Sequence, residues 1–108
     1  MGSMDFQAVL ATLREGVTSL ATNTVQNYVN EAKTDGLNLV ESLKTDIQTW
    51  EQELAEGKIS ALDVEFLIMA QKELIEMTAL KQAGLGLIKV NEFKNNVLQL
   101  VLKAVIGR

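Results

Sequence analysis

Hydrophobic residues recur three and four positions apart along the first half of the chain, which is the spacing of one face of an α-helix. No proline interrupts this half or any other part of the sequence, so long helices are sterically allowed throughout. The pattern predicts an amphipathic helical arm over residues 5–56. Its apolar stripe is formed by Phe6, Val9, Leu10, Leu13, Val17, Leu20, Val25, Tyr28, Ala32, Leu39, Leu43, Ile47, Trp50 and Leu54.

An eleven-residue period underlies part of this stripe. Residues 25–57 divide into three lines, VQNYVNEAKTD, GLNLVESLKTD and IQTWEQELAEG, with apolar residues in matching columns. Eleven residues make three helical turns at about 3.67 residues per turn, close to the relaxed value of 3.6. The period therefore carries the helix through Gly36, although Asp-Gly normally marks a turn. Two interpretations stay open: a continuous helix over 5–56, and a helix broken at 34–37.

The stretch around Gly57 is the closest approach to a functional motif in this sequence. With Gly57 at the sixth position of a calcium-binding loop, Leu54 would occupy a ligand position and Asp63 would replace the bidentate glutamate. The sequence therefore does not favour a calcium site. Gly57 as a left-handed helix C-cap, followed by Ser60 as an N-cap with Asp63 three residues later, explains the same residues as the turn of a helical hairpin.

A returning helix is predicted over residues 61–83. Apolar residues occupy a wide face, which is typical of a helix buried against two neighbours. The face consists of a stripe, Leu62, Phe66, Ala70, Leu74, Met77 and Leu80, widened by Val64, Leu67, Ile68 and Ile75. Gly84-Leu85-Gly86 interrupts the pattern, and a final helix is predicted from about Asn91. Residues 87–90 are a connector or part of that helix.

These elements predict a single all-α domain over residues 4–108. Met1-Gly2-Ser3 precedes a second methionine and is expected to be a cloning remnant. The architecture we expect is a long helical hairpin, with its turn at 57–60, closing into a three- or four-helix bundle.

The composition argues against an enzyme. The chain has no histidine and no cysteine, which removes the commonest general base, the thiol nucleophile and the usual transition-metal ligands. We therefore expect no catalytic residue, no metal and no cofactor. The net charge of −4 makes nucleic acid an improbable partner. The absence of cysteine and of a visible signal peptide leaves the compartment open and slightly favours the cytoplasm.

The length of the first arm suggests a function. At 1.5 Å per residue a continuous helix over 5–56 would be about 75 Å long, whereas the helix over 61–83 would cover only about 35 Å. We therefore expect a non-enzymatic interaction or assembly module that binds another helical protein or itself, with a dimer favoured. The candidate interaction residues are Tyr28, Leu39, Leu43, Ile47, Trp50, Leu98, Val101, Leu102 and Val105.

The C-terminal segment supports an alternative function. Residues 84–108 carry four basic side chains and one acidic one, whereas residues 1–83 carry a net charge of −7. A basic amphipathic helix can pack in the bundle, pack on a second subunit or lie on an anionic membrane surface. The eleven-residue period is similar to that of exchangeable apolipoproteins, although the proline that usually separates their repeats is absent. The alternative is therefore a lipid- or membrane-surface-binding helical protein.

Overall fold

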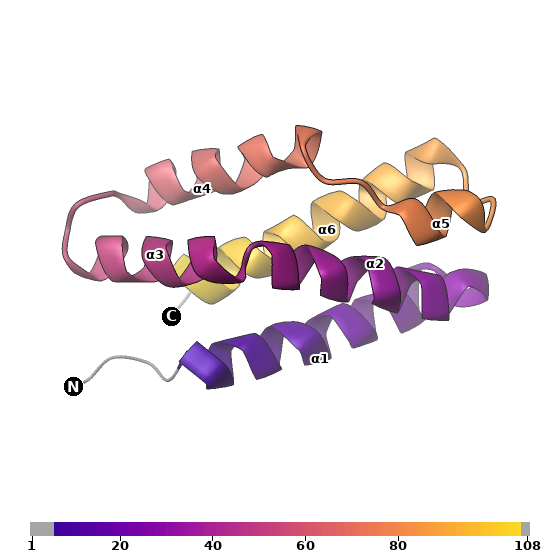
Figure 1. The fold of residues 1–108 in the computed structure, drawn as a ribbon, viewed down its shortest axis with the longest axis horizontal. Helices are drawn as coiled ribbons and strands as arrows, with labels where there is room; N and C mark the ends of the chain where they lie inside the picture. Colours follow the sequence, from indigo (N-terminus) through magenta and orange to yellow (C-terminus); the bar gives the residue numbers. More distant parts are fainter. Residues whose placement is uncertain (1–5, 107–108) are drawn as a thin grey trace.

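The computed structural model describes residues 6–106, and within this range the regular secondary structure is entirely helical. The elements pack into an all-α bundle of four antiparallel arms, formed by α1, by α2 with α3, by α4 with α5, and by α6 (Figure 1). In chain order they are α1 (Phe6–Thr24), η1 (Gln26–Tyr28), α2 (Val29–Ser42), α3 (Lys44–Ala55), α4 (Ala61–Ala70), η2 (Gln71–Glu73), α5 (Thr78–Gln82) and α6 (Leu87–Ile106).

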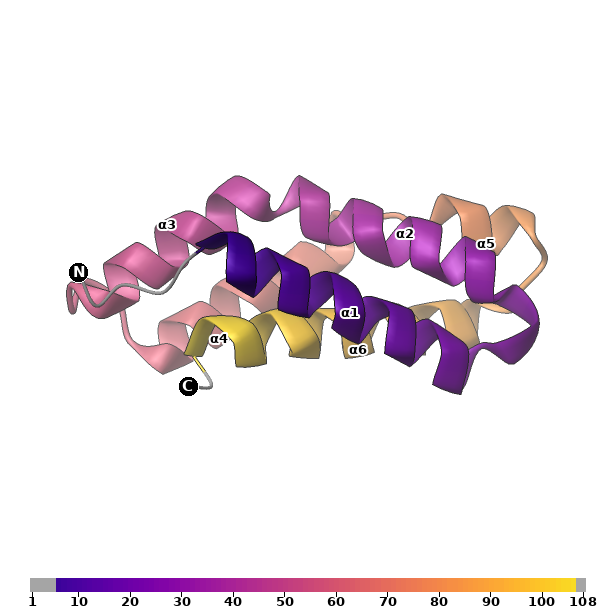
Figure 2. The same ribbon diagram turned by 90° about the horizontal axis from the view of Figure 1, so that it is seen from below.

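The final helix is the centre of the bundle. Helix α6 packs against α1, α2, α3, α4 and α5, and the molecule measures 44 × 24 × 18 Å. Seen from below, α1 lies in front of α6 and α4 lies behind it (Figure 2). The apolar face of α6 is buried by these neighbours and consists of Val90, Phe93, Val97, Leu98, Val101, Leu102 and Val105.

The first arm is not a continuous helix, and it does not break at 34–37. It reverses direction at 25–28, where Val25 leaves the helical conformation with φ −134° and ψ 63°. A run of threonine and asparagine precedes this point, and such residues are poor helix formers. The hydroxyls of Thr22 and Thr24 donate to the carbonyls four residues earlier, at 3.0 and 2.7 Å. Helix α1 therefore folds back along α2.

The helix does pass through Gly36, because that residue lies inside α2 and is buried. A Cβ atom built at Gly36 would lie 2.5 Å from Val17 Cγ1 and 3.4 Å from Phe93 Cζ. The glycine therefore serves close packing of α1, α2 and α6, and it marks no turn. The arm bends instead at Leu43, between α2 and α3, where the Ser42 hydroxyl donates 2.8 Å to the Leu39 carbonyl.

The hairpin turn predicted at 57–60 is confirmed. Gly57 has φ 76°, and the amide of Lys58 donates to the Glu53 carbonyl at 2.9 Å, which is the glycine-containing C-cap expected here. Helix α4 then begins with a reciprocal capping box. The Asp63 amide donates 3.1 Å to the Ser60 hydroxyl, and the Ser60 amide donates 2.9 Å to the Asp63 carboxylate.

The prediction of one continuous helix over 61–83 is wrong, because this segment forms two helices with a break between them. Helix α4 ends at Ala70, the chain passes through η2 and a non-helical stretch at 74–77, and α5 begins at Thr78. Gly84, with φ 99°, ends α5 as the Gly-Leu-Gly interruption predicted. The final helix begins at Leu87, four residues before the predicted start, so residues 87–90 are helical.

Candidate interaction surface

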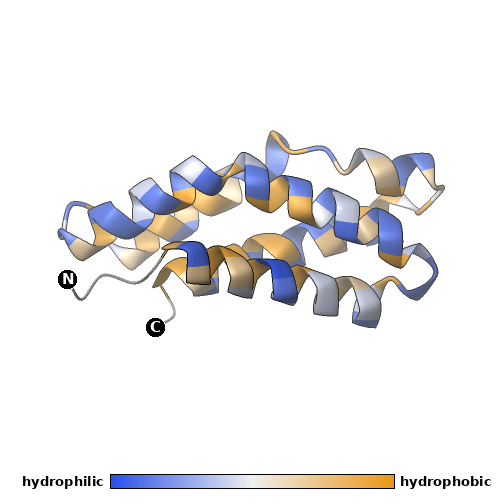
Figure 3. Ribbon diagram, turned by 60° about the horizontal axis from the view of Figure 1, so that its bottom comes forward, coloured by the Kyte–Doolittle hydropathy of each residue, from blue (hydrophilic) through white to orange (hydrophobic). Residues whose placement is uncertain are grey.

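The arms of the bundle present hydrophilic residues outward and hydrophobic residues inward, as the α2–α3 arm shows clearly (Figure 3). Helix α4 departs from this rule. Val64 and Ile68 on its inner side are fully buried, yet Leu62 and Phe66 on its outer side are 73 and 77% exposed. A helix that is apolar on all sides normally has neighbours on all sides. The outer side of α4 therefore lacks a neighbour in the single chain.

We call this outer side, formed by Leu62 and Phe66, the α4 face. Leu74, just beyond η2, is 75% exposed and extends the apolar surface along the same arm. At 100° per residue, Asp63 and Glu65 lie on the two flanks of the α4 face, and both are exposed. The sequence placed Leu62, Phe66 and Leu74 on a buried stripe. The structure corrects this, because α6 packs on the side of α4 that carries Val64 and Ile68.

A second apolar feature lies between α1 and α6. The edge of α1 that faces α6 carries small residues four positions apart, Ala8, Thr12 and Gly16, which leave a hollow of about 370 Å3. We call it the α1–α6 groove. A Cβ atom at Gly16 would lie 3.3 Å from Leu100 Cδ1, so the two helices approach closely at this end of the groove. Its remaining walls are Val9, Leu13, Lys103 and Ala104.

A more polar hollow of about 320 Å3 lies where the chain reverses after α1. It is lined by Asn23, Thr24, Val25, Gln26, Asn27, Tyr28, Leu85 and Lys89. Tyr28, one of the candidate interaction residues, is half-buried here.

The other candidate interaction residues lie inside the fold. Trp50, which also lies on the apolar stripe of the first arm, is 7% exposed and belongs to the core. The remaining buried members of the set are Leu39, Leu43, Ile47, Leu98, Val101, Leu102 and Val105. The first arm has no uncovered stripe of about 75 Å, as the prediction of a continuous helix required, because the arm folds on itself and α6 covers the rest. Interaction through this set stays a prediction, and exposed apolar residues offer a more accessible surface.

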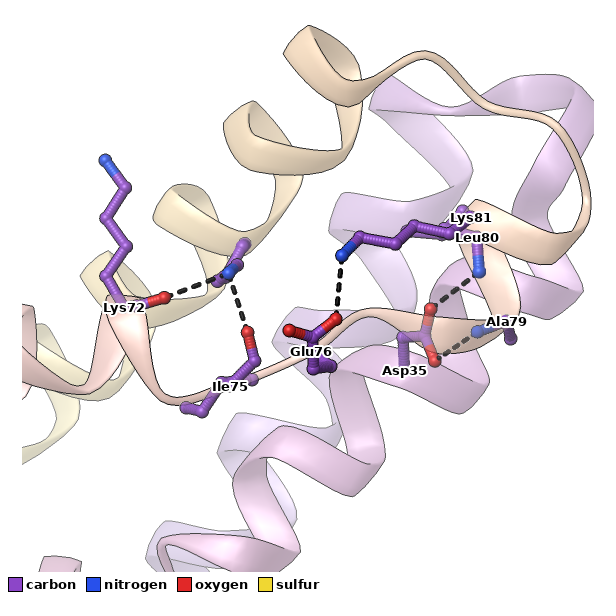
Figure 4. A network of polar contacts seen from close by, with 8 residues as sticks. Asp35, Lys72, Ile75, Glu76, Ala79, Leu80 and Lys81 are labelled. Carbon is purple, nitrogen blue, oxygen red and sulfur yellow. Dashed lines mark hydrogen bonds and ion pairs between the residues drawn. The ribbon is translucent and has the colours of Figure 1, made fainter.

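Two charged side chains, one buried and one partly buried, bind backbone groups of the bundle, and the buried one is Asp35 (Figure 4). The Asp35 carboxylate, 5% exposed, accepts hydrogen bonds from the amides of Ala79 and Leu80 at 3.0 and 2.7 Å. The Lys94 ammonium donates to the carbonyls of Lys72 and Ile75 at 2.9 and 2.7 Å. The Lys94 bonds hold the segment between α4 and α5, and the Asp35 bonds hold the first turn of α5. Both charged side chains therefore have structural roles.

Two surface carboxylates, Glu56 and Glu76, have a lowered pKa, and hydrogen bonds to a neighbouring lysine are the main cause in each case. The Lys81 ammonium donates a 2.7 Å hydrogen bond to the Glu76 carboxylate and lowers the pKa of Glu76 below its ordinary value. Both side chains are exposed, so this pair is a surface ion pair of modest worth. A lowered pKa keeps Glu76 charged near neutral pH and gives it no role as a proton donor.

Two kinds of site are missing from the described part of the chain. Within residues 6–106, histidine, cysteine, aspartate and glutamate side chains do not gather in threes at a place that could hold a metal ion. The same residues contain no helix with both the length and the apolarity that crossing a bilayer requires.

Comparison with known proteins adds no functional assignment. No family model, no curated protein and no solved structure significantly matches this chain. The α4 face and the α1–α6 groove are therefore the features on which a functional proposal depends.

Proposed function

We propose that this protein is a non-enzymatic helical assembly module that associates with copies of itself through the α4 face. The observation that carries the proposal is the exposure of Leu62 and Phe66 on a helix whose inner side is already buried. Exposed contiguous apolar side chains on a small domain commonly mark an interface. A large aromatic such as Phe66 is also the kind of side chain that contributes most to binding at interfaces.

The apolar area that the α4 face can bury sets the expected affinity of self-association. A fully buried aromatic side chain removes roughly 150–250 Å2 from water, so Phe66, which is 77% exposed, supplies about a fifth of the ~800 Å2 per partner of a standard interface, and Leu62 adds to this area. Leu74 adds a third contact if the partner reaches past η2. We therefore expect association in the micromolar range, with one or two side chains responsible for most of it.

The alternative function, binding to a lipid or membrane surface, is supported less well. It depends on the apolar excess of the basic C-terminal segment, but the apolar face of α6 from Val90 to Val105 is buried in the bundle, and only Leu87 and Ile88 at the start of the helix are large exposed hydrophobic residues. The exposed apolar residues of α4 lie between Asp63 and Glu65, and anionic lipid headgroups repel such carboxylates. Burial of α6 and the charge of α4 thus both favour a protein partner.

Sedimentation equilibrium on three chains tests the proposal. The wild type should show a mass that rises with concentration, and Phe66→Ser should raise the concentration needed for association about tenfold or more. Ile88→Ser is the matched control, because Ile88 is equally exposed, at 76%, but lies on α6 away from the α4 face. Equal weakening by both variants would show that general surface apolarity, and not the α4 face, drives association.

A further inference from the structure

The α4 face lies on the outer side of one arm of the bundle, and the α1–α6 groove lies between two other arms. Figure 1 shows α4 and α1 as the outermost arms, with α6 and the α2–α3 arm between them, and Figure 2 shows α1 in front and α4 at the back. The α4 face of one chain therefore cannot enter the groove of that same chain. Each feature is left uncovered in the monomer, and only a second molecule can cover it.

The two features match in spacing. Leu62, Phe66 and the exposed Ala70 follow one another four residues apart along α4, and they form a ridge about 12 Å long at 1.5 Å per residue. The wall of the groove formed by Ala8 through Gly16 has the same spacing and the same length. Ridges of this kind pack into grooves of this kind when two helices cross. The groove volume of about 370 Å3 is far more than the ~15 Å3 that one water needs, so it has room for apolar side chains.

The two features also match in charge. Helix α4 carries two acidic residues, Asp63 and Glu65, and no basic one. The groove is lined by one charged side chain, Lys103, which is exposed and has no ion pair among residues 6–106. An acidic helix that enters the groove places a carboxylate near this ammonium, whereas two α4 faces brought together would place carboxylates against each other.

We propose that the α4 face of one copy docks in the α1–α6 groove of the next copy, with Phe66 in the groove and Glu65 near Lys103. This inference rests on the proposed function and names the surface that receives the α4 face. Because the two surfaces differ, the contact is head-to-tail, and two copies joined by one contact leave one α4 face and one groove uncovered. Such contacts close into rings or extend into filaments, so the assembly grows beyond a dimer.

Two variants separate the halves of this contact. Phe66→Ser removes the main side chain of the α4 face and keeps the groove. Thr12→Glu keeps the α4 face and places a carboxylate in the groove, where it repels Glu65 and pairs with Lys103. Both positions are exposed, so the melting temperatures should stay near that of the wild type. Ala8→Glu, at the end of the groove away from Gly16, serves as a second groove variant.

Sedimentation velocity on the separate and mixed chains gives the decisive result. We expect each variant alone to stay monomeric at concentrations where the wild type forms species larger than a dimer. An equimolar mixture of Phe66→Ser and Thr12→Glu should form a dimer and nothing larger, because one intact groove and one intact α4 face remain per pair.

Other outcomes would overturn the inference. If Thr12→Glu and Ala8→Glu both assemble like the wild type while Phe66→Ser does not, the α4 face meets another surface, such as the α4 face of a second copy. An acyl lipid found in the groove by native mass spectrometry, with assembly unchanged by the groove variants, would assign the groove to a lipid. A wild type that stays monomeric would reject the proposed function itself.

Discussion

The carboxylate of Asp35 accepts a 2.7 Å hydrogen bond from the backbone amide of Leu80, a residue 45 positions later in the sequence. It accepts a second bond, at 3.0 Å, from the amide of Ala79. The first amides of a helix have no partner within that helix, so a buried carboxylate from α2 satisfies the start of α5. This contact joins two arms of the bundle and fixes where the returning helix resumes after its break.

Replacement of Asp35 should therefore destabilise the fold. We expect Asp35→Ala to lower the free energy of unfolding by about 1–3 kcal/mol, because one buried and one partly buried amide lose their acceptor. Asp35→Asn should cost less, since one carbonyl oxygen remains. Urea denaturation followed by circular dichroism measures the loss. Glu15→Gln, an exposed substitution on α1, is the control and should change stability by less than about 0.5 kcal/mol. If the Asp35→Ala chain were as stable as the control, the hydrogen bonds of Asp35 would not stabilise the fold.

The same contact explains why part of the fold could not be predicted. The break at 74–77 depends on Asp35 and Lys94, which lie far along the chain from the segment that they hold. Apolar periodicity over 61–83 is helical throughout, and only tertiary hydrogen bonds override it. By contrast, the turn at Gly57 depends on local chemistry, a left-handed glycine and a capping box, and the sequence alone predicted it.

The candidate interaction surface was missed for a different reason. Apolar residues occupy every side of α4, so a helical period cannot decide whether Val64 or Phe66 faces the core. Packing against α6 makes that choice. The sequence did contain a signal. The apolar face of α4 is wider than one neighbouring helix can cover, which predicts a second neighbour, and Asp63 and Glu65 flank the part that a second neighbour would cover. In the single chain, however, the outer side of α4 is exposed.

Gly36 should be intolerant of even one added carbon. A gain of about 1 kcal/mol in helix propensity is expected from Gly36→Ala. The new Cβ would lie 2.5 Å from Val17 Cγ1, and overpacking of this kind costs about 1–3 kcal/mol. We expect net destabilisation in the wild type, measured by urea denaturation.

The same substitution in a Val17→Ala background should become neutral or stabilising, because the clashing methyl group is gone. A penalty of the same size in both backgrounds would be inconsistent with the contact between α1 and α2 described above.

The turn between α3 and α4 gives a third prediction. Gly57 has φ 76°, a conformation that an alanine side chain resists, so Gly57→Ala should cost roughly 1 kcal/mol of unfolding free energy. Gly57→Asn should cost less, because asparagine tolerates the left-handed region. No neighbouring atom lies within 4 Å of a Cβ built at this position, so steric clashes do not contribute to the difference in stability between the two variants. Equal losses for the two variants would argue against the C-cap.

Core and surface apolar residues should respond differently to polar substitution. Ile47 is fully buried, so Ile47→Asp leaves a charge without a partner in the core and should abolish cooperative thermal unfolding. Phe66→Ser should keep a melting temperature near that of the wild type, because Phe66 is already exposed. Thermal melts followed by circular dichroism compare them. An Ile47→Asp chain that melts like the wild type and only loses mass would instead place Ile47 at an interface between chains.

The mass of the wild-type chain as a function of concentration tests the central claim most directly. Light scattering after size exclusion, from low micromolar to high micromolar loading, should give a mass that rises above the 11.9 kDa of one chain. The rise should continue past twice this mass if successive copies add head to tail. A mass that stays at 11.9 kDa over the whole range, with the helical circular dichroism intact, would contradict the claim that this bundle is an assembly module.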